Sequence, residues 1–242
     1  LVVMARVHSH LERANSTKRL QKLSSQLSRY LAPQVCKSLL DGSRDAQIRT
    51  QRKKLSVFFS DIKDFTASTA KWQPEDITFL LNSYFSEMSR IAHEYGGTLD
   101  KYTGDGLVAF WGAPLPSDHH SDRAIEAARA MVLRVRAWNV LRMSQGLLPA
   151  RVRIGVEAGS VLVGDLGTPF RRTYTAVGDC INTASKLQAI AKTLQFDLVV
   201  GPVAAGQSQT SGLVPVASQQ LPGHNEVSVL WSFPSLVSSL PA

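Results

Sequence analysis

The chain has 242 residues, 44% of them hydrophobic, and it carries a formal net charge of +8. This length can bury the core of one substantial α/β domain with an appendage. No run of about twenty apolar residues is present, so we expect no membrane-spanning segment, and no secretory signal pattern is visible. The two cysteines, Cys36 and Cys180, lie far apart in the sequence and are expected to be free thiols. Because the sequence begins with Leu1, we expect it to be part of a longer protein.

The positive charge is concentrated at the N-terminal end. Residues 1–54 contain twelve Lys or Arg against three Asp or Glu, whereas the rest of the chain is close to neutral. We favour a solvated helix for this segment. A position just inside a membrane stays open, because cytoplasmic flanks of membrane helices are rich in Lys and Arg. Nucleic acid is not an expected partner, because no aromatic residues are interleaved with the basic ones. The expected location of the main domain is cytoplasmic, with anchoring of the parent protein to the inner membrane as an open alternative.

Two helices are predicted before the main domain. Residues 9–31 form the first, and an apolar stripe on it suits pairing with a second copy of the chain. The stripe consists of Leu20, Leu23, Leu27 and Leu31. The sequence PQVCKSLLDG predicts a further short helix that ends at Gly42. We therefore divide the chain into a helical extension (1–32), a short helical element with a linker (33–53) and the main domain (54–242).

Helices and strands alternate in the main domain. The polar stretch SRDAQIRTQRKK is expected to be a connector, and a strand, Leu55–Phe59, follows it. The next elements are a helix over 74–95, a hairpin within 98–111 that turns at TGDG, a helix from Ser121 or Asp122, two strands within 150–167 hinged at Ala158-Gly159, a helix over 178–194, and strands at 196–200 and 225–233. This order predicts an α+β fold with a ferredoxin-like (βαββαβ) core and an N-terminal helical extension.

Two aspartates are expected to meet in this fold. Asp61 follows the first strand, in FFSDIKDFT, and Asp105 lies in the tight turn of the hairpin. In a ferredoxin-like sheet these strands lie side by side, so the two carboxylates can meet at one edge. They repel each other unless a divalent cation lies between them, and Mg²⁺ takes one or two carboxylates together with water and phosphate. The pair therefore predicts a divalent metal site.

Four motifs, in order, resemble the class III adenylyl and guanylyl cyclase catalytic domain. They are FSDIKDFT, LDKYTGDGLVAFWGAP, VRIGVEAGSVLVGDLG and YTAVGDCINTASKL, and the resemblance covers about residues 50–235. The segment SSQLSRYLAPQVCKSLLDG is similar to the short helical element that relays signals into such domains. The resemblance implies a core of the class III nucleotidyl cyclase type, a signalling helix or coiled coil within 1–32, a transducer element within 33–53 and an upstream sensor domain in the full-length chain.

The resemblance assigns Asp61 and Asp105 to two metal ions, Mg²⁺ or Mn²⁺, with the Ile62 carbonyl as a further ligand. One ion would activate the ribose 3′-hydroxyl of the nucleotide for attack on the α-phosphate. The other would hold the triphosphate and the leaving pyrophosphate. The backbone N–H groups of Phe65 and Thr66, which open a helix, would bind phosphate.

The resemblance also implies residues that bind the nucleotide. Arg153 matches the pyrophosphate-binding arginine of the family, and Lys101 and Thr175 match the residues that contact the purine. A lysine donor with a hydroxyl acceptor complements adenine, which has an acceptor at N1 and a donor at N6. Guanine has the opposite pattern, so ATP is the expected substrate. The Lys and Thr pair resembles a bacterial-type subclass of homodimeric adenylate cyclases in which bicarbonate stimulation is common.

Two positions depart from the family pattern. Asn182 matches the asparagine that orients the ribose, but the arginine expected four residues later, which stabilises charge at the α-phosphate, is Lys186. A lysine that often contacts the terminal phosphates is replaced by His224. The exchange of arginine for lysine keeps the charge and loses the planar pair of donors, so slower turnover is expected.

The expected function is an adenylate cyclase that converts ATP to 3′,5′-cyclic AMP and pyrophosphate. In this family each site combines the metal residues of one subunit with the purine and ribose residues of the other, so a homodimer with two shared sites is expected. The departures at Lys186 and His224 keep open a degenerate nucleotide-binding domain with a regulatory role, and a guanylate cyclase is the other alternative. His119 and His120 are expected to be exposed loop residues, and Trp111 is expected to pack in the core or an interface.

Overall fold

The computed structural model describes residues 13, 15–19, 21–22, 50–65, 69–70, 72–146, 149–168 and 170–237. The chain divides into two units, Leu1–Gln47 and Ile48–Ala242. The described residues of the first unit are helical, as expected for this segment. The predicted leucine stripe and the transducer helix lie outside the described residues. No helix in the described part of the chain is long and apolar enough to cross a membrane.

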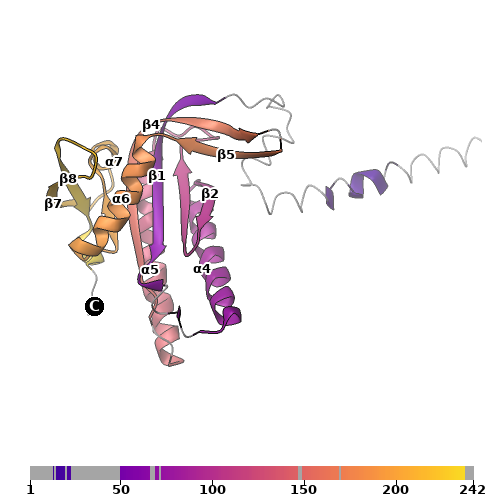
Figure 1. Cartoon of the computed structure of the whole chain (residues 1–242), viewed down its shortest axis with the longest axis horizontal. Helices are drawn as coiled ribbons and strands as arrows, with labels where there is room; N and C mark the ends of the chain where they lie inside the picture. Colours follow the sequence, from indigo (N-terminus) through magenta and orange to yellow (C-terminus); the bar gives the residue numbers. More distant parts are fainter. Residues whose placement is uncertain are drawn as a thin grey trace, which may run out of the picture. The chain divides into compact units, whose positions relative to one another are not determined.

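The described part of the second unit forms one eight-stranded sheet with helices on both faces (Figure 1). The strands are β1 (Gln51–Ile62), β2 (Thr98–Thr103), β3 (Gly106–Trp111), β4 (Val152–Thr168), β5 (Arg171–Val177), β6 (Leu198–Val200), β7 (Val214–Gln220) and β8 (Val227–Ser232). The helices are α4 (Pro74–Glu94), α5 (His120–Ser144), α6 (Asp179–Leu194) and α7 (Pro202–Gln207), with a 3₁₀ turn over Pro234–Leu236. The strand order is β2-β3-β1-β4-β6-β8-β7, and β5 pairs with β4.

Side chains of β1 alternate between the two faces of the sheet. Phe58 and Ile62 pack in the larger core cluster with α4 and α5, whereas Leu55 and Val57 pack in a second cluster with α6. Figure 1 shows α4 and α5 together on one side of the strands and α6 on the other. Asp61 shares the parity of Leu55 and Val57, so it lies on the α6 face. The candidate site is built on this face.

The structure confirms the predicted α+β fold. The element order β1-α4-β2-β3-α5-β4 and the neighbours β2-β3-β1-β4 are those of a ferredoxin-like core. Two expectations about the strands are wrong. Gln51–Lys54, predicted as connector, already belong to β1. The predicted hinge at Ala158-Gly159 does not occur, because β1 pairs with β4 continuously from Val152 to Val163 and keeps it one strand. β5, β7 and α7 are additional elements that the sequence analysis does not identify.

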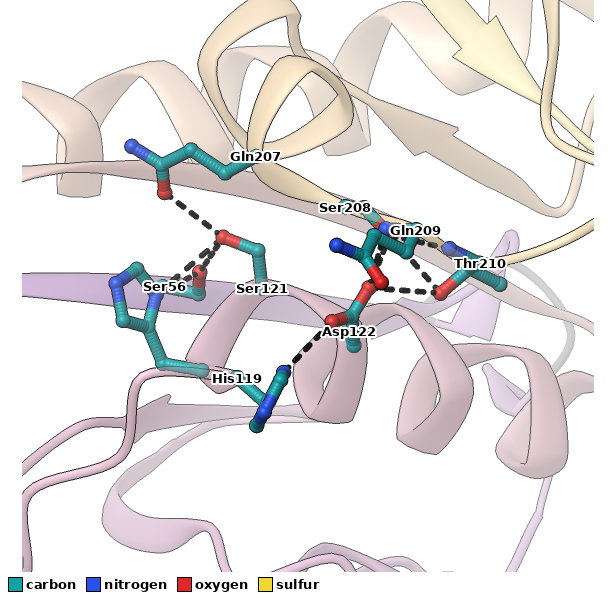
Figure 2. A network of polar contacts seen from close by, with 9 residues as sticks. Ser56, His119, Ser121, Asp122, Gln207, Ser208, Gln209 and Thr210 are labelled. Carbon is teal, nitrogen blue, oxygen red and sulfur yellow. Dashed lines mark hydrogen bonds and ion pairs between the residues drawn. The ribbon is translucent and has the colours of Figure 1, made fainter.

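A buried polar network fastens the start of α5 to β1 (Figure 2). Ser56 Oγ lies 2.8 Å from His120 Nδ1 and 2.9 Å from Ser121 Oγ, and Ser121 donates to Gln207 Oε1 at 3.0 Å. The expectation of an exposed loop residue is therefore wrong for His120, which is buried and begins α5. Its neighbour His119 is exposed as expected, with 70% of its side chain accessible.

A second group of contacts joins α5 to the segment after α7. The Asp122 carboxylate accepts hydrogen bonds from Ser208 Oγ and from the Gln209 N–H, each at 2.7 Å. Figure 2 shows Asp122 pointing toward this segment, with His119 on its other side. These bonds and the deeper Ser56 network hold α5 and α7 against the sheet, on the side opposite the candidate site.

Candidate active site

Asp61 and Asp105 lie together at one edge of the sheet. Asp61 is the penultimate residue of β1, and Asp105 lies in the β2–β3 turn, where a Cβ on Gly106 would come within 2.0 Å of Ser60 O. Only glycine allows this close approach of the turn to β1. Burial raises the pKa of Asp61 to about 6, and hydrogen bonding and repulsion from Asp105 add to the rise. An Asp61 carboxylate whose ionisation is disfavoured, next to a second carboxylate, suits a divalent cation.

Arg153 lies beside this pair, as its place on the neighbouring strand requires. It is the register partner of Asp61, and its Nη2 lies 3.9 Å from Asp61 Oδ2 and 3.9 Å from Asp64 Oδ1. Only 11% of the side chain is exposed, and the buried Nε has no hydrogen-bond partner among the described residues. Lys192 Nζ lies 3.9 Å from the same Asp64 oxygen. Arg153 therefore stands next to Asp61, and Lys192 next to Asp64, where both cations can bind phosphate.

Gln188 is a site residue that the sequence analysis does not identify. Its Nε2 donates to Asp61 Oδ2 at 3.3 Å, and this bond favours the ionised form of Asp61. Gln188 lies on α6, and a Cβ on Gly155 of β4 would clash with the Gln188 backbone at 2.4 Å. The glycine thus lets α6 pack close enough for its side chain to reach the end of β1.

The expected phosphate-binding turn is described only in part. Ile62 ends β1 opposite Val152, and its side chain is buried. Phe65 packs against the core cluster of α4 and α5. Thr66 lies outside the described residues, so its phosphate contact stays a prediction. Asp64, which lies between Ile62 and Phe65, has a φ of 55°. This is a left-handed conformation that Asp tolerates better than most residues.

Lys101 and Thr175, on different strands, lie near one buried carboxylate. Lys101 Nζ is 3.3 Å from Asp100 Oδ2, and the Asp100 side chain is only 4% exposed. Burial raises the pKa of Asp100, and the Thr175 hydroxyl and the Lys101 ammonium oppose the rise. The sequence analysis does not identify Asp100, because simple alternation on β2 directs neighbouring side chains to opposite faces.

The remaining predicted residues lie on α6. Asn182 is exposed in its first turns, and Lys186 donates to Pro222 O at 2.5 Å. His224 Nε2 lies 3.2 Å from Thr183 Oγ1, so it belongs to the same group of side chains. The structure thus brings Lys186 and His224, the two departures from the family pattern, to one side of the helix.

The acidic side chains available for a cation are few. In the described ranges, no three His, Cys, Asp or Glu residues cluster as a metal site. Asp61 and Asp105 are a pair, and Mg²⁺ commonly binds with one or two carboxylates while water and phosphate complete its shell. The donor set therefore fits a cation that completes its shell with water and phosphate.

Comparison with known proteins identifies the family. The family model of the adenylate and guanylate cyclase catalytic domain matches residues 48–231. This range contains all four motifs and all the candidate site residues. The chain belongs to this family. The predicted resemblance to class III cyclases is confirmed.

Three of the proteins that are similar to this cyclase domain are bacterial adenylate cyclases. Adenylate cyclase 1 of Rhizobium meliloti is 34% identical over 141 residues, which is 58% of the chain and 21% of that protein. The adenylyl cyclase CyaB of P. aeruginosa is 30% identical, with a TM-score of 0.69 over 76% of this chain and 94% of that one. A bacterial light-regulated adenylyl cyclase shares the fold, with a TM-score of 0.82 and 21% identity over 93% of this chain and 65% of that one. The cyclase domain thus spans about a fifth of the first relative's length.

Proposed function

We propose that this cyclase domain converts ATP to 3′,5′-cyclic AMP and pyrophosphate. The approach of Asp61 to Asp105 carries the proposal. Burial and, to a smaller extent, repulsion from Asp105 raise the pKa of Asp61, and a divalent cation would offset both effects. These two carboxylates and the Ile62 carbonyl would hold two ions, Mg²⁺ or Mn²⁺. When bound, the ions would supply Lewis-acid chemistry to the ribose 3′-hydroxyl and to the phosphates.

The side chains around the pair would bind and orient the nucleotide. Arg153 lies beside Asp61 with a buried Nε that has no hydrogen-bond partner in the part of the chain that the structure describes, which suits a phosphate group. Lys101 would donate to adenine N1, and Thr175 would accept from the N6 amino group. Asn182 would orient the ribose, and Lys186 would stabilise charge at the α-phosphate.

We further propose that the active form is a head-to-tail homodimer. The metal-binding residues of one subunit would face the purine-binding and ribose-binding residues of its partner. The two-fold axis would generate two equivalent sites. The carboxylates would come from one subunit; the partner would supply Lys101, Thr175, Asn182 and Lys186. Because in-line attack requires close positioning, an upstream sensor in the parent protein could control activity by small displacements of the two subunits.

Product analysis tests this function. The purified chain is incubated with ATP or GTP and Mn²⁺, and cyclic nucleotides are separated and quantified. We expect cyclic AMP from ATP, and a loss of at least a hundredfold in Asp61→Asn and Asp105→Asn, the scale of removing a metal from its catalytic role. The exposed Asp118→Asn is the matched control and keeps wild-type activity. Preferential formation of cyclic GMP would contradict the proposed substrate.

A nucleotide-binding regulatory domain is the second candidate. Lys186 is engaged by Pro222 O at 2.5 Å and His224 stands where a lysine is common in the family, so charge stabilisation at the phosphates is weaker than the family pattern. ATP binding without any cyclic nucleotide, in a folded dimer with Mn²⁺, is the result that this candidate requires.

A further inference from the structure

We infer that Asp100 is a specificity-determining residue that fixes the direction of the Thr175 hydroxyl and the position of the Lys101 ammonium, and so excludes guanine. The inference rests on the proposed function, in which Lys101 and Thr175 contact the purine. It adds a residue to that site and a reason why a hydroxyl, which can donate as well as accept, selects one base.

A β-bulge places Asp100 next to Lys101. In the β2–β3 ladder, Leu99 pairs with Ala109 but Lys101 pairs with Val108, so Asp100 is the extra residue. A bulge breaks the alternation of side chains and re-aims them. As a result the neighbours Asp100 and Lys101 form an ion pair of 3.3 Å, the acid buried and the lysine about half exposed. The acid lies beneath the surface and the lysine reaches outward.

Asp100 and Thr175 each have a buried side-chain oxygen that forms no hydrogen bond in the described part of the chain. Asp100 Oδ1 and Thr175 Oγ1 are both buried and have no hydrogen-bond partner among the described residues. The hydroxyl nevertheless lies near enough to stabilise the ionised carboxylate. The two groups do not form a hydrogen bond with each other in this subunit. A small closure of β5 toward β2 would satisfy both atoms, and buried polar atoms without partners are costly.

The chemistry of the two groups fixes the direction of this bond. An ionised carboxylate accepts hydrogen bonds and cannot donate, whereas a hydroxyl has one hydrogen to give. The Lys101 ammonium 3.3 Å away favours the ionised form of Asp100. When β5 closes toward β2, the hydrogen of Thr175 would therefore be directed to Asp100, and the lone pairs of Oγ1 would remain for the substrate.

This direction distinguishes the two purines. An oxygen that has already given its hydrogen can accept from the adenine N6 amino group, but it cannot donate to guanine O6. The ammonium of Lys101 complements adenine N1 and opposes the N1–H of guanine. One buried carboxylate, Asp100, thus sets both contacts, although it does not itself touch the base.

The first test removes the hydroxyl. Thr175→Val keeps the shape of the side chain, and kcat/KM is measured with ATP and with GTP in the Mn²⁺-loaded homodimer. We expect about a tenfold loss with ATP, the value of one hydrogen bond, and no change with GTP. A freely rotating hydroxyl would serve both bases, so an equal loss with ATP and GTP would overturn the inference. This test does not depend on whether Asp100 variants fold.

The second test removes the charge that directs the hydroxyl. In Asp100→Asn, whose folding is checked by thermal unfolding, we expect the ATP-to-GTP ratio of kcat/KM to fall about tenfold. The Asn amide can donate to Thr175 Oγ1, which leaves the hydroxyl hydrogen free to bind guanine O6. On the Thr175→Val background the same change should bring no gain with GTP. The exposed Asp118→Asn is the matched control. An unchanged ratio in folded Asp100→Asn, or a gain that persists without the hydroxyl, would refute the role of Asp100.

A binding measurement separates this inference from the proposed function. The affinities of fluorescent ATP and GTP analogues are measured for the wild-type chain and both variants. If wild type binds nucleotide without forming cyclic AMP, the proposed function fails while the ratio of affinities still reports on Asp100. Parallel changes in both affinities would count against the inference even in an active enzyme.

Discussion

Arg153 lies directly opposite Asp61 in the β1–β4 ladder, yet its Nη2 stays 3.9 Å from Asp61 Oδ2. This cation lowers the pKa of Asp61 less than burial and Asp105 raise it, since the net result is a pKa of about 6. Ionisation of Asp61 is therefore a cost to the metal-free fold, and a bound cation would offset this cost.

Because ionisation of Asp61 destabilises the metal-free fold, replacing this residue should stabilise the fold and inactivate the enzyme. Because the folded pKa of Asp61 is raised, its ionisation destabilises the metal-free fold as pH rises from about 4 to about 6, and the loss persists above that range. Asp61→Asn should raise the free energy of unfolding at pH 8 by about 1 kcal/mol after allowance for the exposed third of the side chain. Urea unfolding with a chelator measures this, with Asp118→Asn as the control. A less stable Asp61→Asn chain would contradict the account.

Gln188 should tune the affinity for metal. Its bond to Asp61 Oδ2 orients the carboxylate, and partners of this kind commonly change metal affinity by about 10–100-fold. Gln188→Leu is expected to weaken Mn²⁺ binding about tenfold, measured by calorimetry or by the electron paramagnetic resonance of free Mn²⁺. Gln145→Leu, at the exposed end of α5, is the control. Equal affinities in both variants would leave Gln188 without this role.

Complementation tests the shared site. Asp61→Ala removes a proposed metal ligand, and Lys101→Ala removes a proposed purine-binding side chain. Each homodimer should therefore be inactive. After the two chains are mixed equally and allowed to exchange, half of the dimers are mixed and each has one intact site, so about a quarter of wild-type activity is expected. Cyclic AMP formation measures it, and size-exclusion chromatography verifies the dimer. A mixture as inactive as its components would argue against sites formed between subunits.

The core of the fold could be predicted because its elements follow simple periodicities. α4 presents Leu80, Tyr84, Met88 and Ile91 to the core at helical spacing, and paired glycines mark the hairpin turn. β5 shows no such pattern, because most of its side chains are exposed or half-buried. β7 contains Pro215 and four polar or small residues after it, a composition atypical of strands. Their pairing partners, β4 and β8, define these strands, and a local pattern does not contain that information.

The site could be predicted where motif order alone fixes proximity. Asp61 and Asp105 meet because the ends of β1 and of the hairpin are neighbours in the sheet. Motif order does not identify Asp100 or Gln188, and the cause differs between the two residues. Asp100 reaches the purine group only through a bulge, which a strand pattern does not reveal. Gln188 lies on a different face of α6 from Asn182. A separation of six residues corresponds to one full helical turn plus about two-thirds of another.

The buried Ser56 network should contribute to stability. Ser56 Oγ contacts both His120 Nδ1 and Ser121 Oγ in a fully buried position, so its removal leaves polar atoms without partners. Ser56→Ala is expected to lower the free energy of unfolding by about 1–3 kcal/mol, measured by urea unfolding at pH 8. Ser144→Ala, which removes one exposed hydroxyl, is the control and should cost less than about 0.5 kcal/mol. Equal losses would show that the network adds nothing beyond a surface serine.

Glu157 should make the stability of the domain depend on pH. It is 3% exposed on β4, and burial raises its pKa to about 7 although Oε1 accepts bonds from the N–H groups of Ala158 and Ala204. Between pH 4.5 and about 7 the unfolded chain releases this proton while the folded chain keeps it, so the free energy of unfolding falls as pH rises. The fall should be on the order of 2–3 kcal/mol, and Glu157→Gln should lack it, because the amide does not titrate. Urea unfolding across this range compares the two with Glu226→Gln, an exposed control whose curve should follow wild type. If Glu157→Gln and wild type instead change in parallel with pH, the carboxyl titrates alike in both states and burial does not govern its proton.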